Sequence, residues 1–177
     1  MKIKLLALAA SYRNDSLNRN LLDAAIPHAE EAGASVTRLD YAALESPPYR
    51  GAHDALPDGA LQFADALLEH DGLLLASPEY NWSVPGSLKN LIDWLSVDDR
   101  APLARRTALL MSATPSARGG LSGLQHLRVP LELLGMWVYP QMIGIGGGTL
   151  SKPKDKERLA DLTQDFVRST KGLRHAR

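Results

Sequence analysis

The 177-residue chain contains no cysteine. This absence excludes disulfides, thiolate nucleophiles, cysteine-ligated zinc and iron–sulfur clusters, so any redox chemistry needs a bound cofactor. The five histidines form neither a His-x-x-x-His pair nor a cluster with carboxylates at ligand spacing. We therefore expect no metal site.

The chain also lacks an excess of either charge. Twenty Lys and Arg residues balance twenty Asp and Glu residues, giving a formal net charge of +0 at pH 7. This balance removes the general electrostatic reason to expect nucleic acid or an acidic membrane as a partner. A small ligand of no charge or of mixed charge is favoured.

Long apolar runs are absent as well. No stretch approaches the roughly twenty apolar residues that span a bilayer. The first eleven residues imitate a secretory signal, but the apolar part is too short and is followed at once by Tyr12-Arg13-Asn14-Asp15. A buried parallel strand has this length and composition. We expect a cytoplasmic protein that does not contact a membrane.

Apolar runs of strand length alternate with helical patterns along the chain. The predicted strands are 3–9, 36–39, 72–76, 107–112 and 136–145. The predicted helices are 17–32, 58–70, 88–95, 121–134 and 154–171. This alternation indicates an α/β protein with a parallel sheet and helices on both faces. The length and a hydrophobic content of 45% fit one compact domain over residues 1–177.

The turn after the first strand distinguishes two α/β arrangements. A dinucleotide-binding domain has Gly-x-Gly-x-x-Gly there, but this turn reads Ala9-Ala10-Ser11-Tyr12-Arg13-Asn14-Asp15-Ser16 and contains no glycine. A hydroxyl-rich turn before a helix suits a phosphate monoester, because hydroxyls and backbone N–H groups converge on it. The turn favours a flavodoxin-like three-layer sandwich, a five-stranded sheet of order 2-1-3-4-5, with ligands at the carboxyl ends of the strands.

The loops after strands one, three and four must open at the same edge of this sheet. In the first loop, Ser11, Arg13, Ser16 and Asn18 carry groups that bind phosphate oxygens. A simpler alternative is that Ser16 only caps the helix and that Arg13 lies in solvent. In the second loop, prolines and a glycine restrict the backbone, while Tyr80 and Trp82 offer aromatic surface either to a flat ligand or to the core.

Three segments resemble motifs of the NADPH-dependent FMN reductase family. The longest runs from Ser77-Pro78-Glu79-Tyr80-Asn81 through Pro85-Gly86-x-Leu88-Lys89-Asn90 to Ile92-Asp93-Trp94. Residues 10–18 resemble the family's Gly-Ser-x-Arg-x-x-Ser-x-Asn turn, with Ala10 in place of glycine. Residues 112–120 resemble its Ser-x-Ser-Pro-Gly-x-x-Gly-Gly segment, with Thr114 and Ser116 as departures. The resemblance covers most of the chain.

The resemblance implies a bound FMN whose N5 atom carries the chemistry, without a catalytic side chain. It implies hydride transfer from NADH or NADPH through FMN to a small acceptor, such as a quinone, an azo compound, free flavin or a chromate-type oxyanion. The phosphate would be held by Ser11, Arg13, Ser16 and Asn18. The isoalloxazine would be lined by Pro78, Glu79, Tyr80 and Asn81, largely through backbone groups, and bordered on its other side by Ser112, Gly119 and Gly120.

The resemblance also implies a homodimer or homotetramer, for which Trp94, Trp137 and the helix at 121–134 are interface or core candidates. One alternative function is a non-enzymatic FMN electron carrier of the flavodoxin type, although such carriers are usually strongly acidic. Another is an interaction module that has lost its flavin. The sequence does not identify the electron acceptor, the effect of Ala10 or how tightly FMN is held. It also leaves open whether NADH or NADPH is preferred. Candidate ligands for the 2′-phosphate of NADPH are Arg50, Arg118 and Lys152.

Overall fold

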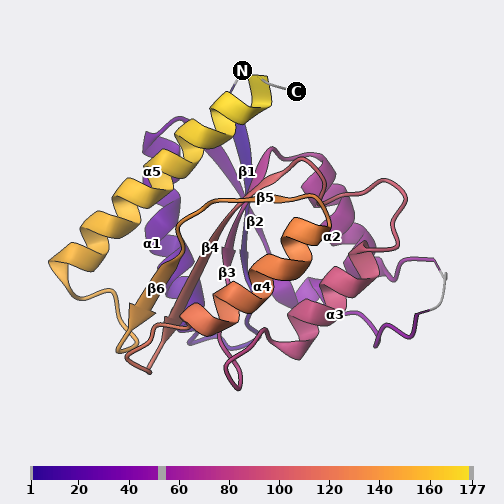
Figure 1. Cartoon of the computed structure of the whole chain (residues 1–177), viewed down its shortest axis with the longest axis horizontal. Coiled ribbons are helices and arrows are strands. Elements are labelled where there is room, and N and C mark those ends of the chain that lie inside the picture. The colour runs from indigo at the N-terminus through magenta and orange to yellow at the C-terminus, as the bar shows by residue number, and fades with distance from the viewer. Residues whose placement is uncertain (1, 52–54, 176–177) are drawn as a thin grey trace.

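The computed structural model describes residues 2–51 and 55–175, which form a parallel sheet between two layers of helices (Figure 1). The order of the strands is β2-β1-β3-β4-β5, with β6 also paired to β4, and every pairing is parallel. The strands are β1 (Ile3–Ala9), β2 (Ala34–Leu39), β3 (Gly72–Ala76), β4 (Thr107–Thr114), β5 (Trp137–Val138) and β6 (Ile143–Gly146). The predicted flavodoxin-like sandwich of order 2-1-3-4-5 is confirmed.

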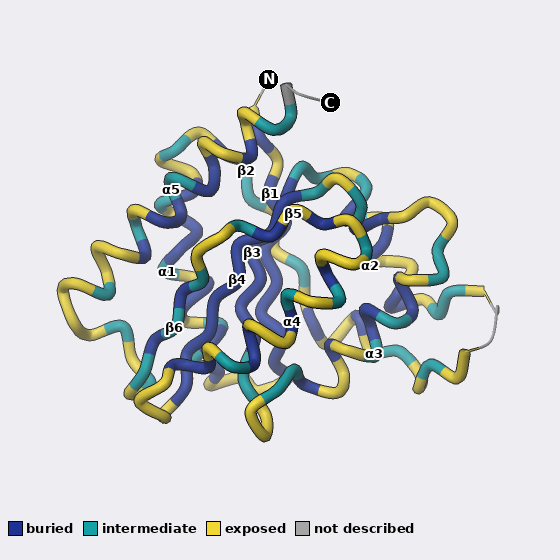
Figure 2. Tube along the Cα trace, viewed as in Figure 1, coloured by how far each residue is buried: buried dark blue, intermediate teal, exposed yellow. Residues whose placement is uncertain are grey.

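The helices are divided between the two faces of the sheet (Figure 1). Alternate residues of β1 point to opposite faces: Leu6 and Leu8 join one apolar cluster, while Leu5 and Ala7 join the other. Figure 2 shows the central strands as the most continuously buried part of the chain. The first cluster is covered by α2 (Asp58–Leu68), α3 (Gly86–Leu95) and α4 (Leu121–Leu133), and the second by α1 (Leu17–Glu31) and α5 (Pro153–His175).

The prediction of one continuous last strand over 136–145 is wrong, because the structure divides it into β5 and β6. Pro140 lies in the gap and has no N–H to donate to a strand ladder. The Arg128 guanidinium donates instead to the carbonyls of Val138 and Tyr139, both at 3.1 Å. These bonds satisfy carbonyls at the end of β5, where the chain leaves the sheet. The sequence also missed a short 3₁₀ helix, η1 (Tyr41–Leu44), which Asp40 caps through the N–H of Ala42.

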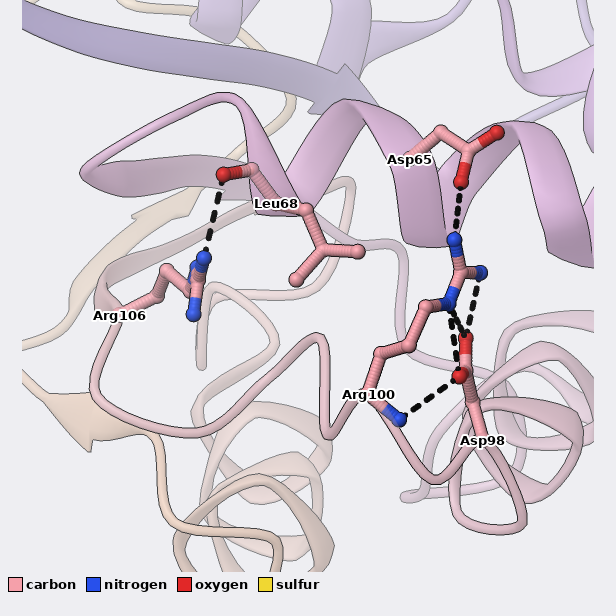
Figure 3. A network of polar contacts seen from close by, with 5 residues as sticks. All are labelled: Asp65, Leu68, Asp98, Arg100 and Arg106. Carbon is pink, nitrogen blue, oxygen red and sulfur yellow. Dashed lines mark hydrogen bonds and ion pairs between the residues drawn. The ribbon is translucent and has the colours of Figure 1, made fainter.

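Two arginines fasten the segment between α3 and β4 onto α2 (Figure 3). Arg106 donates to the carbonyls of Leu67 and Leu68, at 3.0 and 3.2 Å, where α2 ends and its last carbonyls have no partner within the helix. Arg100 bridges Asp65 on α2 at 2.6 Å and Asp98 at 2.7 Å. Hydrogen bonding from Arg100 holds the pKa of the Asp98 carboxyl below its usual value, although burial opposes this shift.

The low pKa of Asp98 predicts a pH-dependent contribution to stability. Its ionised form stabilises the fold above about pH 4, the value for an unfolded chain, and this contribution is lost as the pH falls through the lower folded pKa. We expect the unfolding free energy of the wild-type protein to fall more steeply than that of Asp98→Asn between about pH 6 and about pH 2, by urea titration. Asp99→Asn, at the exposed neighbouring position, controls for net charge. Equal slopes for wild type and Asp98→Asn would contradict the prediction.

Candidate functional site

A cavity of about 330 Å³ lies at the carboxyl edge of the sheet, where the loops after β1, β3 and β4 meet. The parallel topology predicts this meeting point, because the carboxyl ends of parallel strands share one edge. The lining residues are Ser11, Arg13, Asp15, Ser16, Leu17, Asn18, Pro78, Glu79, Tyr80, Ala113, Thr114 and Pro115.

One end of the cavity carries unused hydrogen-bond donors at the start of α1. Ser16 caps the helix, and its hydroxyl accepts from the N–H of Arg19 at 3.3 Å. Within the described part of the chain, the N–H groups of Ser16, Leu17 and Asn18 donate to no acceptor. Such N–H groups, together with the dipole of the helix, attract phosphate. With the Ser11 hydroxyl beside them, they fit a phosphate monoester.

Arg13, the basic residue of this turn, lines the cavity and is largely exposed to solvent. Its guanidinium is paired with Asp15 at 2.7 Å, and both side chains are largely exposed. The hydrogen bond between them lowers the pKa of Asp15 and raises that of Arg13. Asp15 therefore offsets part of the positive charge that Arg13 would offer to a phosphate.

Ala10, which replaces the family's usual glycine, does not obstruct the cavity. Its N–H donates to the carbonyl of Ala76 at 2.8 Å, so the backbone continues the pairing of β1 with β3. Its methyl group is buried in the apolar cluster beneath α2 and α3. The substitution therefore enlarges the core by one methyl group and leaves the phosphate end of the cavity unchanged.

Asn18 has a structural task that the sequence did not predict. Its Nδ2 donates to the carbonyl of Ala113 at 3.1 Å, and its Oδ1 accepts from the N–H of Ala113 at 2.9 Å. The side chain is buried, and these two bonds tie the first turn of α1 to the end of β4. One N–H group and the oxygen of the Asn18 side-chain amide are thus bonded to the protein backbone.

Pro78, Glu79 and Tyr80 bring the second loop to the cavity. Tyr80 and Ser83 exchange backbone hydrogen bonds of 3.1 and 3.0 Å, closing a two-residue turn. Its central residues, Asn81 and Trp82, have φ of 50° and 65°, which is the pattern of a type I′ turn. The Glu79 carboxylate accepts from the N–H of Gly123 at 2.7 Å and so fixes this loop to the first turn of α4.

The third loop reaches the cavity through Ala113, Thr114 and Pro115. Ser112 is fully buried, and its hydroxyl has no hydrogen-bond partner among the described residues. Gly120 lies against that hydroxyl, and a Cβ atom on Gly119 would approach the carbonyl carbon of Gly144 to 2.7 Å. Both glycines have left-handed φ, of 65° and 75°. They allow this loop to pack on β4 and β6.

The structure brings seven of the eleven predicted cofactor residues to the cavity: Ser11, Arg13, Ser16, Asn18, Pro78, Glu79 and Tyr80. Of the described residues, Asn81, Ser112, Gly119 and Gly120 lie outside the lining. Sequence reasoning missed five lining residues, namely Asp15, Leu17, Ala113, Thr114 and Pro115. All five lie within the predicted loops, so their position in those loops could have identified them. A search for hydrogen-bonding side chains alone does not find Leu17 and Ala113.

The Asn18 contact predicts a large loss of stability on truncation. Asn18→Ala leaves the N–H and the carbonyl of buried Ala113 without partners, and we expect a loss of about 2–3 kcal/mol in unfolding free energy. Urea unfolding measures this, with Asn20→Ala as the matched control because Asn20 is exposed on the same helix. A cost for Asn18→Ala no larger than that of the control would rule out the structural role.

The fold defines a flavodoxin-like protein with a cavity at the carboxyl edge of its sheet, and comparisons with known proteins agree on the fold. Residues 3–149 match the NADPH-dependent FMN reductase family. A quinone reductase of Escherichia coli (strain K12) is 32% identical over 171 residues, which cover 94% of this chain and 90% of that protein. The NAD(P)H-dependent FMN reductase PA1204 of Pseudomonas aeruginosa is 34% identical over 134 residues, covering 75% of this chain and 71% of that protein.

A solved structure shares the same architecture. FerB, a flavoenzyme NAD(P)H:(acceptor) oxidoreductase of Paracoccus denitrificans, superposes with a TM-score of 0.80 at 24% identity, covering 97% of this chain and 98% of that one. The chain belongs to the NADPH-dependent FMN reductase family. It is an oxidoreductase with FMN as its cofactor and NADH or NADPH as its electron donor.

Proposed function

We propose that this enzyme transfers electrons from NAD(P)H through FMN to a quinone, and that the cavity at the carboxyl edge of the sheet holds the flavin. The observation that carries the proposal is the set of unused donors at the start of α1, beside the hydroxyls of Ser11 and Ser16. These groups would hold the FMN phosphate. The backbone of Pro78, Glu79 and Tyr80 would lie along the isoalloxazine.

When bound, FMN would supply the hydride chemistry that links the nicotinamide to the acceptor. The task of the chain is to hold the flavin in one position. The Glu79–Gly123 bond and the Tyr80–Ser83 turn fix the second loop, and the Asn18–Ala113 bonds fix the first loop against the third.

The aromatic surface at the cavity favours a quinone as the electron acceptor. Tyr80 lines the cavity and is about half exposed. Tyr12, also half exposed, stands between the lining residues Ser11 and Arg13, and its ring lies 4.8 Å from that of buried Tyr41. Exposed rings of this kind stack on planar molecules. The match to relatives named quinone reductases supports the same acceptor class.

Mutation of the phosphate end provides the test. We expect Ser11→Ala/Ser16→Ala to weaken FMN binding by about tenfold or more, because two hydroxyl contacts to a charged group are removed. Fluorescence titration of the flavin-free protein measures the affinity. Ser151→Ala, at an exposed site before α5, is the control.

Anaerobic spectra then test the reaction. Bleaching of bound FMN by NADH or NADPH, and its return on addition of a quinone, are the expected results. Absence of FMN binding by the wild-type protein, together with absence of NAD(P)H oxidation in the presence of a quinone, would contradict the proposed function.

We also propose that residues 1–177 act as one cytoplasmic domain that forms a homo-oligomer through α4. Val129 and Leu133 are the most exposed large apolar side chains in the described part of the chain, and Leu121 and Trp137 are exposed near them in sequence. Trp94, the other tryptophan considered for an interface, belongs to the core, where its indole N–H donates to the carbonyl of Pro47 at 2.7 Å. Within the described residues, no helix combines the length and apolar character needed to cross a membrane.

The role of α4 predicts the behaviour of one surface variant. Leu133→Glu places a charge on an apolar face that oligomerisation would bury, and we expect light scattering to show a lower mass than for the wild-type protein. Leu61→Glu, on an exposed position of α2, is the matched control and should retain the wild-type mass. An unchanged mass for Leu133→Glu would exclude α4 as the interface.

A further inference from the structure

One cation–π contact joins the loops that follow β3 and β4. The central carbon of the Arg118 guanidinium lies 4.2 Å from the centroid of the Trp82 ring. The same two loops line the cofactor cavity through Pro78–Tyr80 and Ala113–Pro115. The contact therefore stands beside the cavity and outside its lining.

Trp82 is held at the surface by its turn. Its φ of 65° is a conformation that bulky residues rarely adopt, and such strain is common at functional sites. The side chain is still 54% exposed, so burial in the core does not explain the conformation. The visible consequence of the strain is that an aromatic face is presented to Arg118.

Arg118 is an unassigned cation of the cavity loops. Residues 11–18, 77–83 and 112–120 contain only two basic residues, Arg13 and Arg118. Arg13 is paired with Asp15, whereas no carboxylate of the described residues lies within 4.0 Å of the Arg118 side-chain nitrogens. Arg118 thus retains its full charge at the surface.

The contact with Trp82 leaves the hydrogen-bonding groups of Arg118 available. The central carbon of the guanidinium lies over the indole ring, and the side-chain N–H groups of Arg118 donate to no acceptor among the described residues. Two parallel N–H groups match two oxygens of a phosphate. NADPH differs from NADH by one phosphate, on the 2′ position of a ribose. We propose that Arg118, oriented by Trp82, binds the 2′-phosphate of NADPH and makes this enzyme prefer NADPH to NADH.

The other two candidate cations are less well placed. Lys152 lines another cavity, together with Lys154 and Asp155, and lies outside the lining of the cofactor cavity. Arg50 is exposed in the segment after η1 and lies outside the lining of the cofactor cavity. Arg118 alone of the three stands on a loop that lines that cavity. The inference rests on the proposed cofactor site, because it requires the nicotinamide to reach a flavin bound there.

Steady-state kinetics of FMN-loaded Arg118→Ala test the inference. With a quinone at saturation, we expect KM for NADPH to rise about tenfold or more, which is the loss of about 1.4 kcal/mol of binding, and KM for NADH to change less than about threefold. Arg118→Lys, which keeps the charge without the planar fork, should lie between the two. Lys152→Ala, the matched control, should change neither KM.

A binding measurement separates this inference from the proposed function. By calorimetry, 2′,5′-ADP should bind the wild-type protein more tightly than 5′-AMP does, and Arg118→Ala should remove the difference. An equal rise of KM for both nucleotides would show that Arg118 only fastens the loops, and a phosphate preference lost in Lys152→Ala would assign the role to Lys152. Either result overturns the inference.

A wild-type protein that oxidises neither nucleotide would contradict the proposed function, and the calorimetry would still decide the role of Arg118.

Discussion

The cavity depends on the paired hydrogen bonds between Asn18 and Ala113. One part of the cavity lining comes from the turn between β1 and α1, and another part comes from the end of β4 and the residue after it. β3 lies between these two strands, so β1 and β4 share no direct strand pairing. One buried amide, used at both its oxygen and its nitrogen, makes that connection. An unpaired amide at this depth would be costly, so the contact is strongly preferred.

Other residues of the site also connect its loops to the rest of the protein. The Glu79 carboxylate accepts a hydrogen bond from α4 and so joins the second loop to that helix. Gly119 and Gly120 lack a Cβ where the third loop meets β4 and β6. Polar and small residues of the loops thus mostly hold one loop against another. The groups left for the ligand are backbone N–H donors, a few hydroxyls and aromatic surface, which suits a cofactor that supplies its own chemistry.

The sequence predicted the framework well because buried parallel strands have a simple pattern. The bounds of β1 and β3 agree residue for residue with the predicted 3–9 and 72–76, since both strands are apolar along their length and end at polar loops. The apolar run over 136–145 does not predict the break between β5 and β6 at Pro140. The bond from Arg128 to Val138 joins residues ten positions apart in the sequence. Local pattern does not encode such a contact.

For the site, the sequence does not predict the direction in which each side chain points. The motif predicted that Ser112 and Asn18 belong near the cavity, but whether each faces a ligand or the protein is decided by packing around it. Ala10 shows the converse: it departs from the motif, yet its methyl group lies in the core. The sequence predicts which loops contribute residues to the cavity, whereas the role of each side chain is seen only in the three-dimensional structure.

The most direct test of the account is to follow the backbone amides by NMR while FMN is added to the flavin-free protein. The account predicts that the amide protons of Leu17 and Asn18 show the largest downfield shifts, because they would donate to the phosphate at the start of α1. Shifts confined to other parts of the chain, with these two amides unchanged at saturating FMN, would contradict it.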